Sequence, residues 1–391
     1  MFEIKTMNKI AKVGLSVFGE GYNIADDTAD PDGIMVRSAS LHEMPVGEKL
    51  LAIARAGAGT NNIPVDAMGE KGVVVFNTPG ANANAVKELA ICGLLLASRD
   101  VVGGVGWVRE NADDPDIAKS VEKNKSRFAG YEIKGKKLGV IGLGAIGGPL
   151  ANAARHLGMT VYGFDPYLSV EAAWNLSRDI KHAASKEEIY ENCDYISVHV
   201  PLIASDDPSK NTKGMIGKNE IAMMKDGVVI LNFARDALVD DAAMKEALES
   251  GKVSRYVTDF PNAASVKMPN TIAIPHLGAS TEESEDNCAV MAAHELKDYI
   301  ENGNIKNSVN YPDVVMPRSG KVRVCVLHKN VPNVLTKLSG VMGEAGVNIE
   351  NMSNRSKKEN AYTIIDTDEL PAGAYEKLVG VDGVIRVRII H

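Results

Sequence analysis

Short apolar runs alternate with amphipathic stretches from Lys9 to about Ala97. The runs are AKVGLSV, GIMVRSA, LLAIARAGAG and VVVFNTPG, and each leads into glycine, proline, asparagine or serine. Residues of these kinds end a strand and pass the chain into a loop. Because strand-like and helix-like stretches alternate, the pattern predicts a parallel sheet with crossover helices.

A second series of the same kind begins near Lys134. Its six strand-like runs are KKLGVIGLGAIG, MTVYGFDP, YISVHVP, GVVILNFARD, SRYVTDFP and TIAIPHLG. Helical stretches separate them, so this region is predicted to be a doubly wound domain. Such domains bind ligands at the carboxyl ends of their strands.

A third segment follows SVNYPDVVMPRSG, a linker with two prolines. KVRVCVLH alternates as a strand does, and VPNVLTKLSGVMGEAG is an amphipathic helix. The later runs are VNIENMSNRS, NAYTIIDTD, PAGAYEKLVGVDG and VIRVRII. Their order, βαββαβ, predicts a small ferredoxin-like domain.

The expected fold class is therefore α/β, with two doubly wound, Rossmann-like parallel-sheet domains and a C-terminal ferredoxin-like domain. We expect residues 1–97 and 285–312 to form the first domain, residues 98–284 the second and residues 318–391 the third.

Composition excludes several kinds of partner. Aromatic residues make up 5% of the 391 residues, which argues against a surface that stacks sugars or single-stranded nucleic acid. The net charge of −8 disfavours a general polyanion binder. No apolar stretch reaches the ~18 residues of a membrane span, and the N-terminus has no signal-like pattern. Four well-separated cysteines without a CxxC motif are typical of a reduced, cytoplasmic protein. We expect no metal site, nucleic-acid partner or membrane association.

The strongest chemical signal is GLGAIG, residues 142–147, which follows a strand and opens a helix. Glycines there allow a tight turn and a close approach of the backbone to a pyrophosphate, whose charge is stabilised at the helix N-terminus. Asp165 ends the next strand, about 20 residues on. A carboxylate at that point accepts hydrogen bonds from ribose hydroxyls and repels a 2′-phosphate, so the pattern predicts NAD rather than NADP.

Two further polar side chains follow strands of the same domain. Arg235 comes after a buried strand in LNFARD, where a guanidinium can bind a carboxylate through two hydrogen bonds. His276 holds the matching place in IPHLG. Taken alone, such an arginine is more often a surface ion-pair partner, and such a histidine an ordinary loop residue. At the strand ends of one nucleotide-binding domain the two should converge on a substrate.

In order, spacing and wording, the segments RAGAGTNNI, NTPGANA, GLGAIG, VHVP, LNFAR and PHLGAST resemble the D-2-hydroxyacid dehydrogenases. The third segment, with HKNVP and GVNI, resembles an ACT domain. The combination is similar to the short, phosphoglycerate-oxidising branch of that family. The resemblance implies NAD-dependent oxidation of D-3-phosphoglycerate to 3-phosphohydroxypyruvate, the first step of the phosphorylated route to L-serine, by a homodimer or homotetramer.

The resemblance also implies roles for individual residues. Arg235 would bind the substrate carboxylate and polarise the carbonyl, His276 would be the general acid/base, and Asp259 matches the family's acid near the nicotinamide amide. The positions implied for cofactor binding are Gly142, Gly144, Ala145, Ile146, Gly147, Asp165, His199, Val200, Pro201, Phe233, Ala234 and Asp259. The positions implied for the substrate are Arg37 and Ser38, which would bind the phosphate, with Arg55, Ala58, Gly59 and Asn82. His328, Asn330 and Asn348 would hold L-serine at the interface between two ACT domains.

The sequence departs from the family pattern in one place. A glutamate that hydrogen-bonds the catalytic histidine usually follows Asp259 after a short spacer, but here the spacer reads FPNAASVKMPN and contains no acid. Asp259 could serve both roles, Glu282 or Glu283 could replace the missing group, or His276 could work unassisted. An active enzyme with weaker tuning of its histidine is the preferred interpretation.

Other functions stay open at this point. A related hydroxypyruvate or glyoxylate reductase would not need Arg37. A regulator built on an inactive dehydrogenase would bind NAD or serine without turnover; the missing glutamate motivates it, and the retained Arg235 and His276 argue against it. The alternative for the ACT-like segment is a plain dimerisation module.

Overall fold

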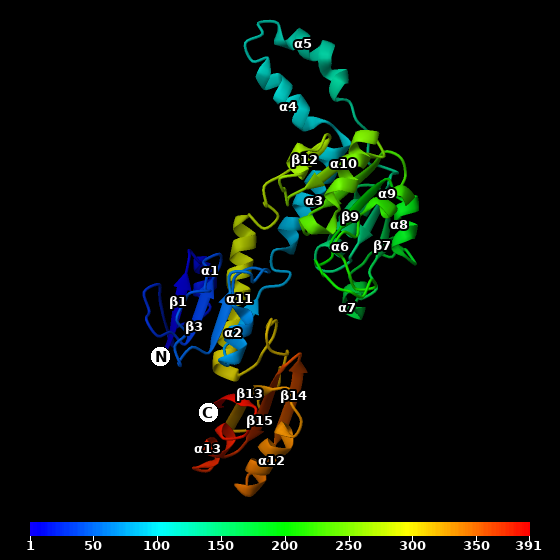
Figure 1. Ribbon diagram of the computed structural model, residues 1–391. Coiled ribbons are helices and arrows are strands. Elements are labelled where there is room, and N and C mark those ends of the chain that lie inside the picture. The colour runs from blue at the N-terminus through cyan, green and yellow to red at the C-terminus, as the bar shows by residue number, and fades with distance from the viewer. The chain divides into compact units, whose positions relative to one another are not determined.

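The computed structural model describes all 391 residues and forms two compact units. The first contains residues 1–82 and 282–391, and the second contains residues 83–281. Figure 1 shows a parallel sheet in each unit and a smaller antiparallel sheet near the C-terminus. The predicted fold class is confirmed. The finer division into three domains stays a prediction, and helix α3 (Ala83–Ser98) falls in the second unit.

The first sheet has five parallel strands in the order β2-β1-β3-β4-β5. The strands are β1 (Phe2–Met7), β2 (Tyr22–Ala25), β3 (Gly33–Val36), β4 (Ala52–Arg55) and β5 (Val74–Asn77), with helices α1 (Lys12–Leu15) and α2 (Val65–Glu70). One expected strand is wrong, because AKVGLSV forms α1 and the first strand is FEIKTM before it. Helix α1 packs on the long helix α11 (Glu282–Asn302), where a Cβ at Gly14 would overlap the backbone of Ala289. This close helix–helix contact outweighs the strand-like composition of the run.

The second unit holds seven parallel strands in the order β12-β11-β10-β9-β6-β7-β8. They are β6 (Lys137–Ile141), β7 (Thr160–Phe164), β8 (Lys181–His182), β9 (Tyr195–Val198), β10 (Val228–Asn232), β11 (Val253–Thr258) and β12 (Thr271–Ala273). The six predicted runs are confirmed as strands. No pattern in the sequence indicated β8, whose two residues are exposed. The strand order reverses between β6 and β9, which is where doubly wound sheets bind their ligands.

Two apolar clusters cover opposite faces of this sheet. Neighbouring residues of one strand belong alternately to one cluster and to the other. Ile230 of β10 belongs to the cluster supplied by α8 (Lys186–Asn192), α9 (Lys218–Met223) and α10 (Asp241–Ser250). Leu231 belongs to the cluster supplied by α3 and α6 (Gly147–His156). The short elements α7 (Val170–Trp174), η2 (Asp236–Leu238) and η3 (Ser265–Lys267) lie in the connections.

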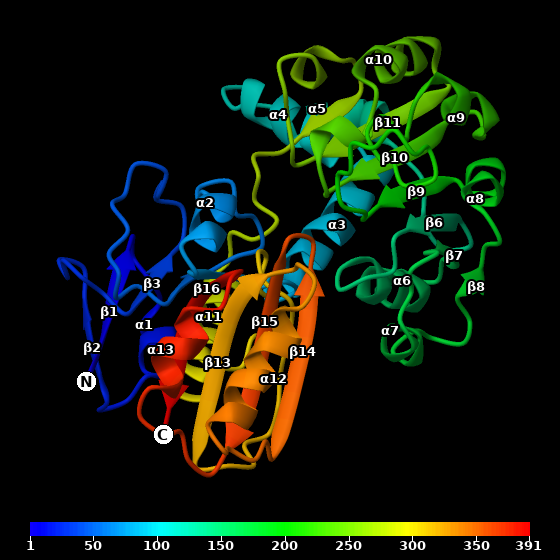
Figure 2. The ribbon, with the colours of Figure 1, turned by 60° about the horizontal axis from the view of Figure 1, so that its bottom comes forward.

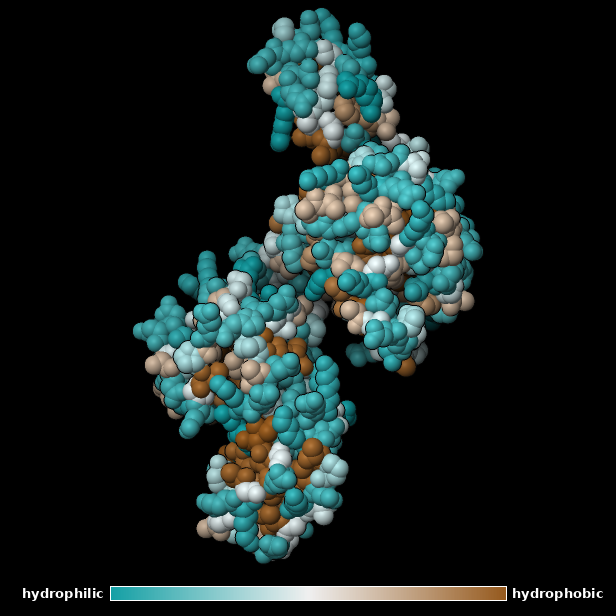
Figure 3. All heavy atoms as spheres, viewed as in Figure 1, coloured by the Kyte–Doolittle hydropathy of each residue, from teal (hydrophilic) through white to brown (hydrophobic).

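A helical arm leaves the second unit between α3 and β6. It consists of α4 (Val101–Glu110), α5 (Ile117–Asn124) and η1 (Lys125–Phe128), and none of these helices has a buried residue. Apolar atoms gather at the base of the arm (Figure 3). No single helix is long and apolar enough to cross a membrane; α3 and α4 meet that test only as a pair, and the pair is bent by 70°.

The third sheet is antiparallel, with the order β14-β15-β13-β16. Its elements are β13 (Val322–Lys329), α12 (Val334–Glu344), β14 (Asn351–Lys357), β15 (Asn360–Thr367), α13 (Ala374–Val379) and β16 (Val384–Ile390), in the predicted βαββαβ order. Figure 2 shows α12 and α13 lying across one face of this sheet. The other face packs into the core of the first unit, where Leu327 and Tyr362 join Tyr299 of α11.

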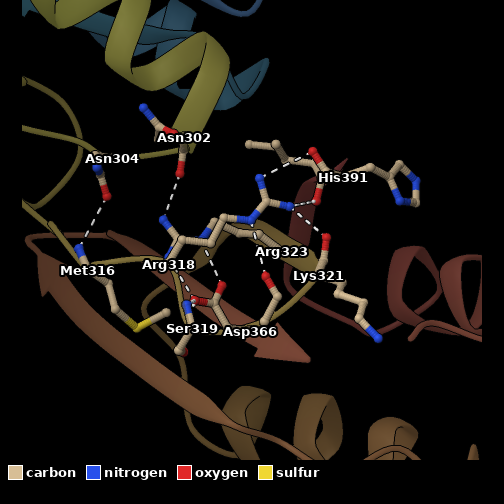
Figure 4. Close-up of polar contacts among 12 residues, drawn as sticks. Asn302, Asn304, Met316, Arg318, Ser319, Lys321, Arg323, Asp366 and His391 are labelled. Carbon is tan, nitrogen blue, oxygen red and sulfur yellow. Dashed lines mark hydrogen bonds and ion pairs between the residues drawn. The ribbon is translucent and has the colours of Figure 1, made fainter. Parts of the chain in front are cut away.

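Buried charges fix this sheet to the C-terminal end of α11 (Figure 4). Arg323 and Asp366 are 1% and 0% exposed and form an ion pair of 2.7 Å. Arg323 also donates to the backbone oxygen of Asn302, and Arg388 donates to those of Tyr299 and Ile300. The last carbonyls of a helix lack partners within the helix and carry partial negative charge, so the two guanidinium groups complete them.

Candidate active site

Three polar side chains follow three neighbouring strands of the second unit. Arg235 follows β10, Asp259 follows β11 and His276 follows β12, and these strands are adjacent and parallel. Phe260 lies between two of the groups: its ring centroid is 4.3 Å from that of His276 and 5.3 Å from the guanidinium carbon of Arg235. The structure therefore brings the predicted chemical groups together. The sequence reasoning missed Phe260, although an aromatic residue directly after Asp259 was a visible signal.

The Asp259 carboxylate is almost fully buried, with 1% of the residue exposed. Its Oδ2 accepts a hydrogen bond of 3.2 Å from the backbone N–H of Gly278, and its Oδ1 has no partner. Burial raises the pKa of Asp259, while the charges of His276 and Arg235 act in the opposite direction. No hydrogen bond joins this carboxylate to the His276 ring.

The loop that carries Arg235 is held from inside the domain. Asn232 is fully buried, and its Nδ2 donates to the backbone oxygen of Arg235 at 2.7 Å. Phe233 is buried against α3, where a Cβ at Gly93 would crowd the Phe233 ring. The exposed Arg235 guanidinium thus extends from a fixed backbone.

The GLGAIG turn requires two of its glycines, because a side chain at either position would clash with backbone atoms. Gly142 has φ of +90°, and a Cβ there would overlap the backbone oxygen of His199. A Cβ at Gly147 would overlap the oxygen of Gly142, whereas Gly144 faces open space. The turn is followed directly by α6, so its backbone N–H groups are available to an anion at the helix N-terminus.

Asp165 supports the same turn. Its Oδ2 accepts from the N–H of Leu143 and its Oδ1 from the N–H of Tyr167, both at 2.9 Å. A pocket of about 680 Å³ lies beside the turn, lined in part by Gly144, Ala145 and Asn152.

His199 lies at the end of β9 and shares a hydrogen bond of 2.7 Å with Ser197. Burial lowers the pKa of His199 to about 4, so the ring is neutral at physiological pH. Its Nδ1 is buried without a partner. Val200 and Pro201 continue the chain from this point, away from the strand.

In the first unit, two arginines occupy neighbouring strand ends. Arg55 is the last residue of β4, and Arg37 follows its partner Val36 at the end of β3. Arg55 donates from Nε to the backbone oxygen of Arg37 at 3.1 Å. Burial lowers the pKa of Arg55, and the charge of Arg37 adds to this effect. Arg37 forms an ion pair of 2.6 Å with Glu285, in which both side chains are about two-fifths exposed.

Other expected substrate positions surround these arginines. The N–H of Ser38 donates to Asn8, and the backbone oxygen of Ala58 accepts from Asn77 at the end of β5. The sequence reasoning missed Asn77, which the strand-end rule could have identified. Gly59 follows Ala58, and Asn82 is the last residue before α3.

Comparison with known proteins identifies the family. A family model described as "D-isomer specific 2-hydroxyacid dehydrogenase, NAD binding domain" matches residues 93–278. The D-3-phosphoglycerate dehydrogenase of Haemophilus influenzae is 34% identical over 88% of this chain and 82% of its own length. That of Escherichia coli is 32% identical over the same shares of the two chains.

The chain belongs to the D-isomer specific 2-hydroxyacid dehydrogenase family. It is an NAD-dependent oxidoreductase, as the sequence predicted.

Solved structures agree with this assignment. The NAD⁺-bound 3-phosphoglycerate dehydrogenase of Entamoeba histolytica aligns with a TM-score of 0.60 at 28% identity, over 79% of this chain and 98% of that one. A glyoxylate reductase from Paecilomyes thermophila aligns with a TM-score of 0.61 at the same identity and coverage.

The residues of this dehydrogenase fit NAD on structural grounds. There is open space at Gly144, and the backbone of the turn is so close-packed that a Cβ at Gly142 or Gly147 would fill it. The buried Nδ1 of His199, at the end of the neighbouring strand, has no partner within the chain. The carboxylate of Asp165 retains lone pairs for hydroxyl donors.

The residues of this dehydrogenase that are expected to bind the effector already form hydrogen bonds within the chain. His328 is buried, and its Nε2 bonds to Thr363 at 2.9 Å. Asn330 donates to the backbone oxygen of Lys358, and Asn348 donates to Glu350. Asn348 lies just before β14, which begins at Asn351.

These residues do not meet within one chain. His328 pairs in register with Ala361 of β15, at one end of the antiparallel sheet. The first residue of β14, Asn351, pairs with Asp366 at the opposite end, and Asn348 lies just before it. A site that contains all three residues therefore needs two copies of the chain.

Proposed function

We propose that this dehydrogenase oxidises D-3-phosphoglycerate to 3-phosphohydroxypyruvate, the first step of the phosphorylated route to L-serine. The observation that carries the proposal is the similarity to relatives named D-3-phosphoglycerate dehydrogenase, at 32–34% identity over four-fifths of their length. The strand-end pair Arg37 and Arg55 supports it, because a chain with net charge −8 needs a local cationic site to hold a phosphorylated acid.

The residues divide the chemistry as follows. His276 accepts the proton of the C2 hydroxyl as a general base. Arg235 binds the carboxylate and stabilises the carbonyl that develops at C2. NAD supplies the hydride acceptor when bound, and Asp259 lies on the nicotinamide side.

The phosphate is bound by Arg37 and Ser38, with Arg55, Ala58, Gly59 and Asn82 as further substrate positions. Phosphate binding replaces the contact of Arg37 with Glu285, because both groups compete for the same guanidinium.

Steady-state kinetics on two substrates test this assignment. Arg37→Ala should raise KM for 3-phosphoglycerate at least tenfold, in line with the loss of a charge-assisted contact worth about 1.5–3 kcal/mol. The same change should leave KM for glyoxylate, measured by reduction, nearly unaltered. Glu285→Gln is the matched control, which frees Arg37 and should lower KM for the phosphorylated acid. Equal effects of Arg37→Ala on both substrates would favour an unphosphorylated acid as the natural substrate, as expected for a glyoxylate reductase.

The chain assembles as a homodimer or larger oligomer. The exposed valines of α4 support this, because Val101, Val102, Val105 and Val108 are each 45–52% exposed along one short helix. L-serine binds between two ACT-like domains, at His328 and Asn330 of one copy and Asn348 of another. A titration of the rate with L-serine tests the effector, and an unchanged rate favours the plain dimerisation module.

A cytoplasmic location fits the four free cysteines, three of which are buried. A regulator that binds NAD without turnover is the other candidate function, motivated by the missing glutamate. Its signature would be NADH binding in a protein with no measurable dehydrogenase rate.

A further inference from the structure

The His276 imidazole packs against the ring of Phe260. The two ring centroids are 4.3 Å apart and the planes are tilted by 43°. The imidazole forms no hydrogen bond in the structure. A histidine that moves a proton needs a fixed ring orientation, and that role commonly belongs to a carboxylate.

The carboxylate of Asp259 interacts with His276 through its charge but forms no hydrogen bond with the ring. Asp259 points its Oδ2 at the N–H of Gly278, two residues beyond His276. A Cβ on Gly278 would lie 2.9 Å from that oxygen, so the close approach depends on glycine. The hydrogen bond of Asp259 therefore fixes the backbone of the histidine loop.

The spacer that lacks the family's glutamate folds on itself. Asn262 donates from Nδ2 to Asp241 of α10 at 2.9 Å, and its Oδ1 accepts from the N–H groups of Ala264 and Ser265. The Ser265 hydroxyl in turn accepts from the N–H of Asn262. These bonds direct Asn262 and Ser265 into the loop and onto α10, and neither side chain bonds to the His276 ring.

The backbone of Phe260 is held on both sides. Its N–H donates to the hydroxyl of Thr258 at 3.0 Å, and Thr258 is fully buried. The spacer bonded to α10 follows it directly. Because its backbone is fixed, the side chain of Phe260 can orient the groups that pack on its ring.

The same ring contacts the second substrate-binding group. The guanidinium carbon of Arg235 lies 5.3 Å from the Phe260 centroid, within the range of a cation–π contact. One phenyl ring thus lies between the proposed base and the proposed carboxylate-binding group.

We propose that Phe260 is a positioning residue. Its ring fixes the orientation of the His276 imidazole and of the Arg235 guanidinium relative to each other, in the place of the absent carboxylate. The inference rests on the proposed function of His276 and Arg235, and it identifies the group that orients them. Of the explanations left open by the sequence, it replaces the unassisted histidine with one assisted by an uncharged ring.

Three substitutions separate a positioning role from a structural one. Phe260→Leu keeps an apolar side chain and removes the ring, and kcat should fall about 10- to 100-fold. Phe260→Tyr keeps the ring and should retain most of the rate. Val266→Ala changes an exposed side chain in the same loop and should alter nothing. Melting temperature and NADH affinity, measured by fluorescence, should be unchanged in all three.

The double variant gives the decisive readout. If Phe260 acts through His276, then Phe260→Leu should lower kcat much less in a His276→Ala background than in wild type, because the group it orients is gone. Equal losses in both backgrounds, or a wild-type kcat for Phe260→Leu, would overturn the inference.

Failure of the proposed function gives a different result. A wild type that turns over glyoxylate or hydroxypyruvate but not 3-phosphoglycerate overturns the substrate, and the Phe260 series is then read with the active substrate. A wild type that turns over none of these acids overturns both.

Discussion

Asp259 is a carboxylate whose position costs stability. It is buried with an unpartnered oxygen, and burial raises its pKa above the ordinary value. A carboxyl group with a raised folded-state pKa favours folding fully below its unfolded value of about 3.9, and this contribution is lost as the pH rises through the folded-state value. As the pH rises through that value, the buried carboxylate of Asp259 therefore lowers the free energy of unfolding.

Asp259→Asn should separate stability from activity. The amide mimics the protonated acid, so the variant should melt above wild type at pH 7 and close to it below pH 4. Its kcat should fall roughly tenfold, because the negative charge beside His276 and Arg235 is removed. Thermal melts at the two pH values and initial rates at pH 7 check both parts. A variant less stable than wild type at pH 7 would contradict the statement that burial of the Asp259 carboxylate costs stability.

Residue-level chemistry was largely predictable at strand ends. Arg235, Asp259 and His276 follow adjacent strands, and the rule that ligands gather at carboxyl ends predicts their convergence. The position of Phe260 directly after Asp259 was visible in the sequence, but its contact with two of them depends on rotamers and on the folded spacer.

Among the helices and strands, the C-terminal end of α11 is the main point of attachment for the antiparallel sheet. Arg323 and Arg388 of the antiparallel sheet donate to its last carbonyls, and Asp366 pairs with Arg323 away from water. The paired charges hold the sheet against the helix, and each depends on the other to offset the cost of burial.

Removing one member of this pair should be worse than removing both. Arg323→Met leaves Asp366 buried without its partner and should destabilise the chain by about 3–5 kcal/mol. Arg323→Met combined with Asp366→Leu should recover most of that loss. Urea denaturation measures the two free energies of unfolding, and an equal loss in single and double variants would show that the pair does not act as a unit.

Elements were predicted well where periodicity was long and poorly where packing decided. The βαββαβ order of the last segment and six strands of the nucleotide-binding sheet follow from the sequence pattern. AKVGLSV became a helix because Gly14 permits close packing on α11, a tertiary contact that a local pattern does not contain.

At the scale of the whole molecule, the chain folds as two units and carries features that the proposed assembly of two copies would bring together. The expected effector residues lie at opposite ends of one sheet, and α4 exposes a row of valines. The sequence indicated three sheets, but it did not indicate that the antiparallel sheet shares a core with α11. That contact joins elements far apart in the chain.

Charge on the arm should therefore dissociate the oligomer. Val102→Lys with Val105→Lys should convert a dimer or larger species into monomer, because lysine is disfavoured at the core of an interface. Light scattering during size-exclusion chromatography measures the mass. Val170→Lys on α7, which is also exposed, is the control and should leave the mass unchanged. A wild type that is already monomeric at micromolar concentration would contradict the assembly.

We propose that His276 acts as the base of an NAD-dependent phosphoglycerate oxidation. The most direct measurement is the initial rate of NADH formation from 3-phosphoglycerate and NAD, in wild type and His276→Ala, with NADH affinity recorded for both. We expect turnover in wild type, a loss of at least 100-fold in kcat for the variant, and equal NADH affinity. Turnover that survives in the variant, or a wild type that binds NADH and forms none from the phosphorylated acid, would contradict it.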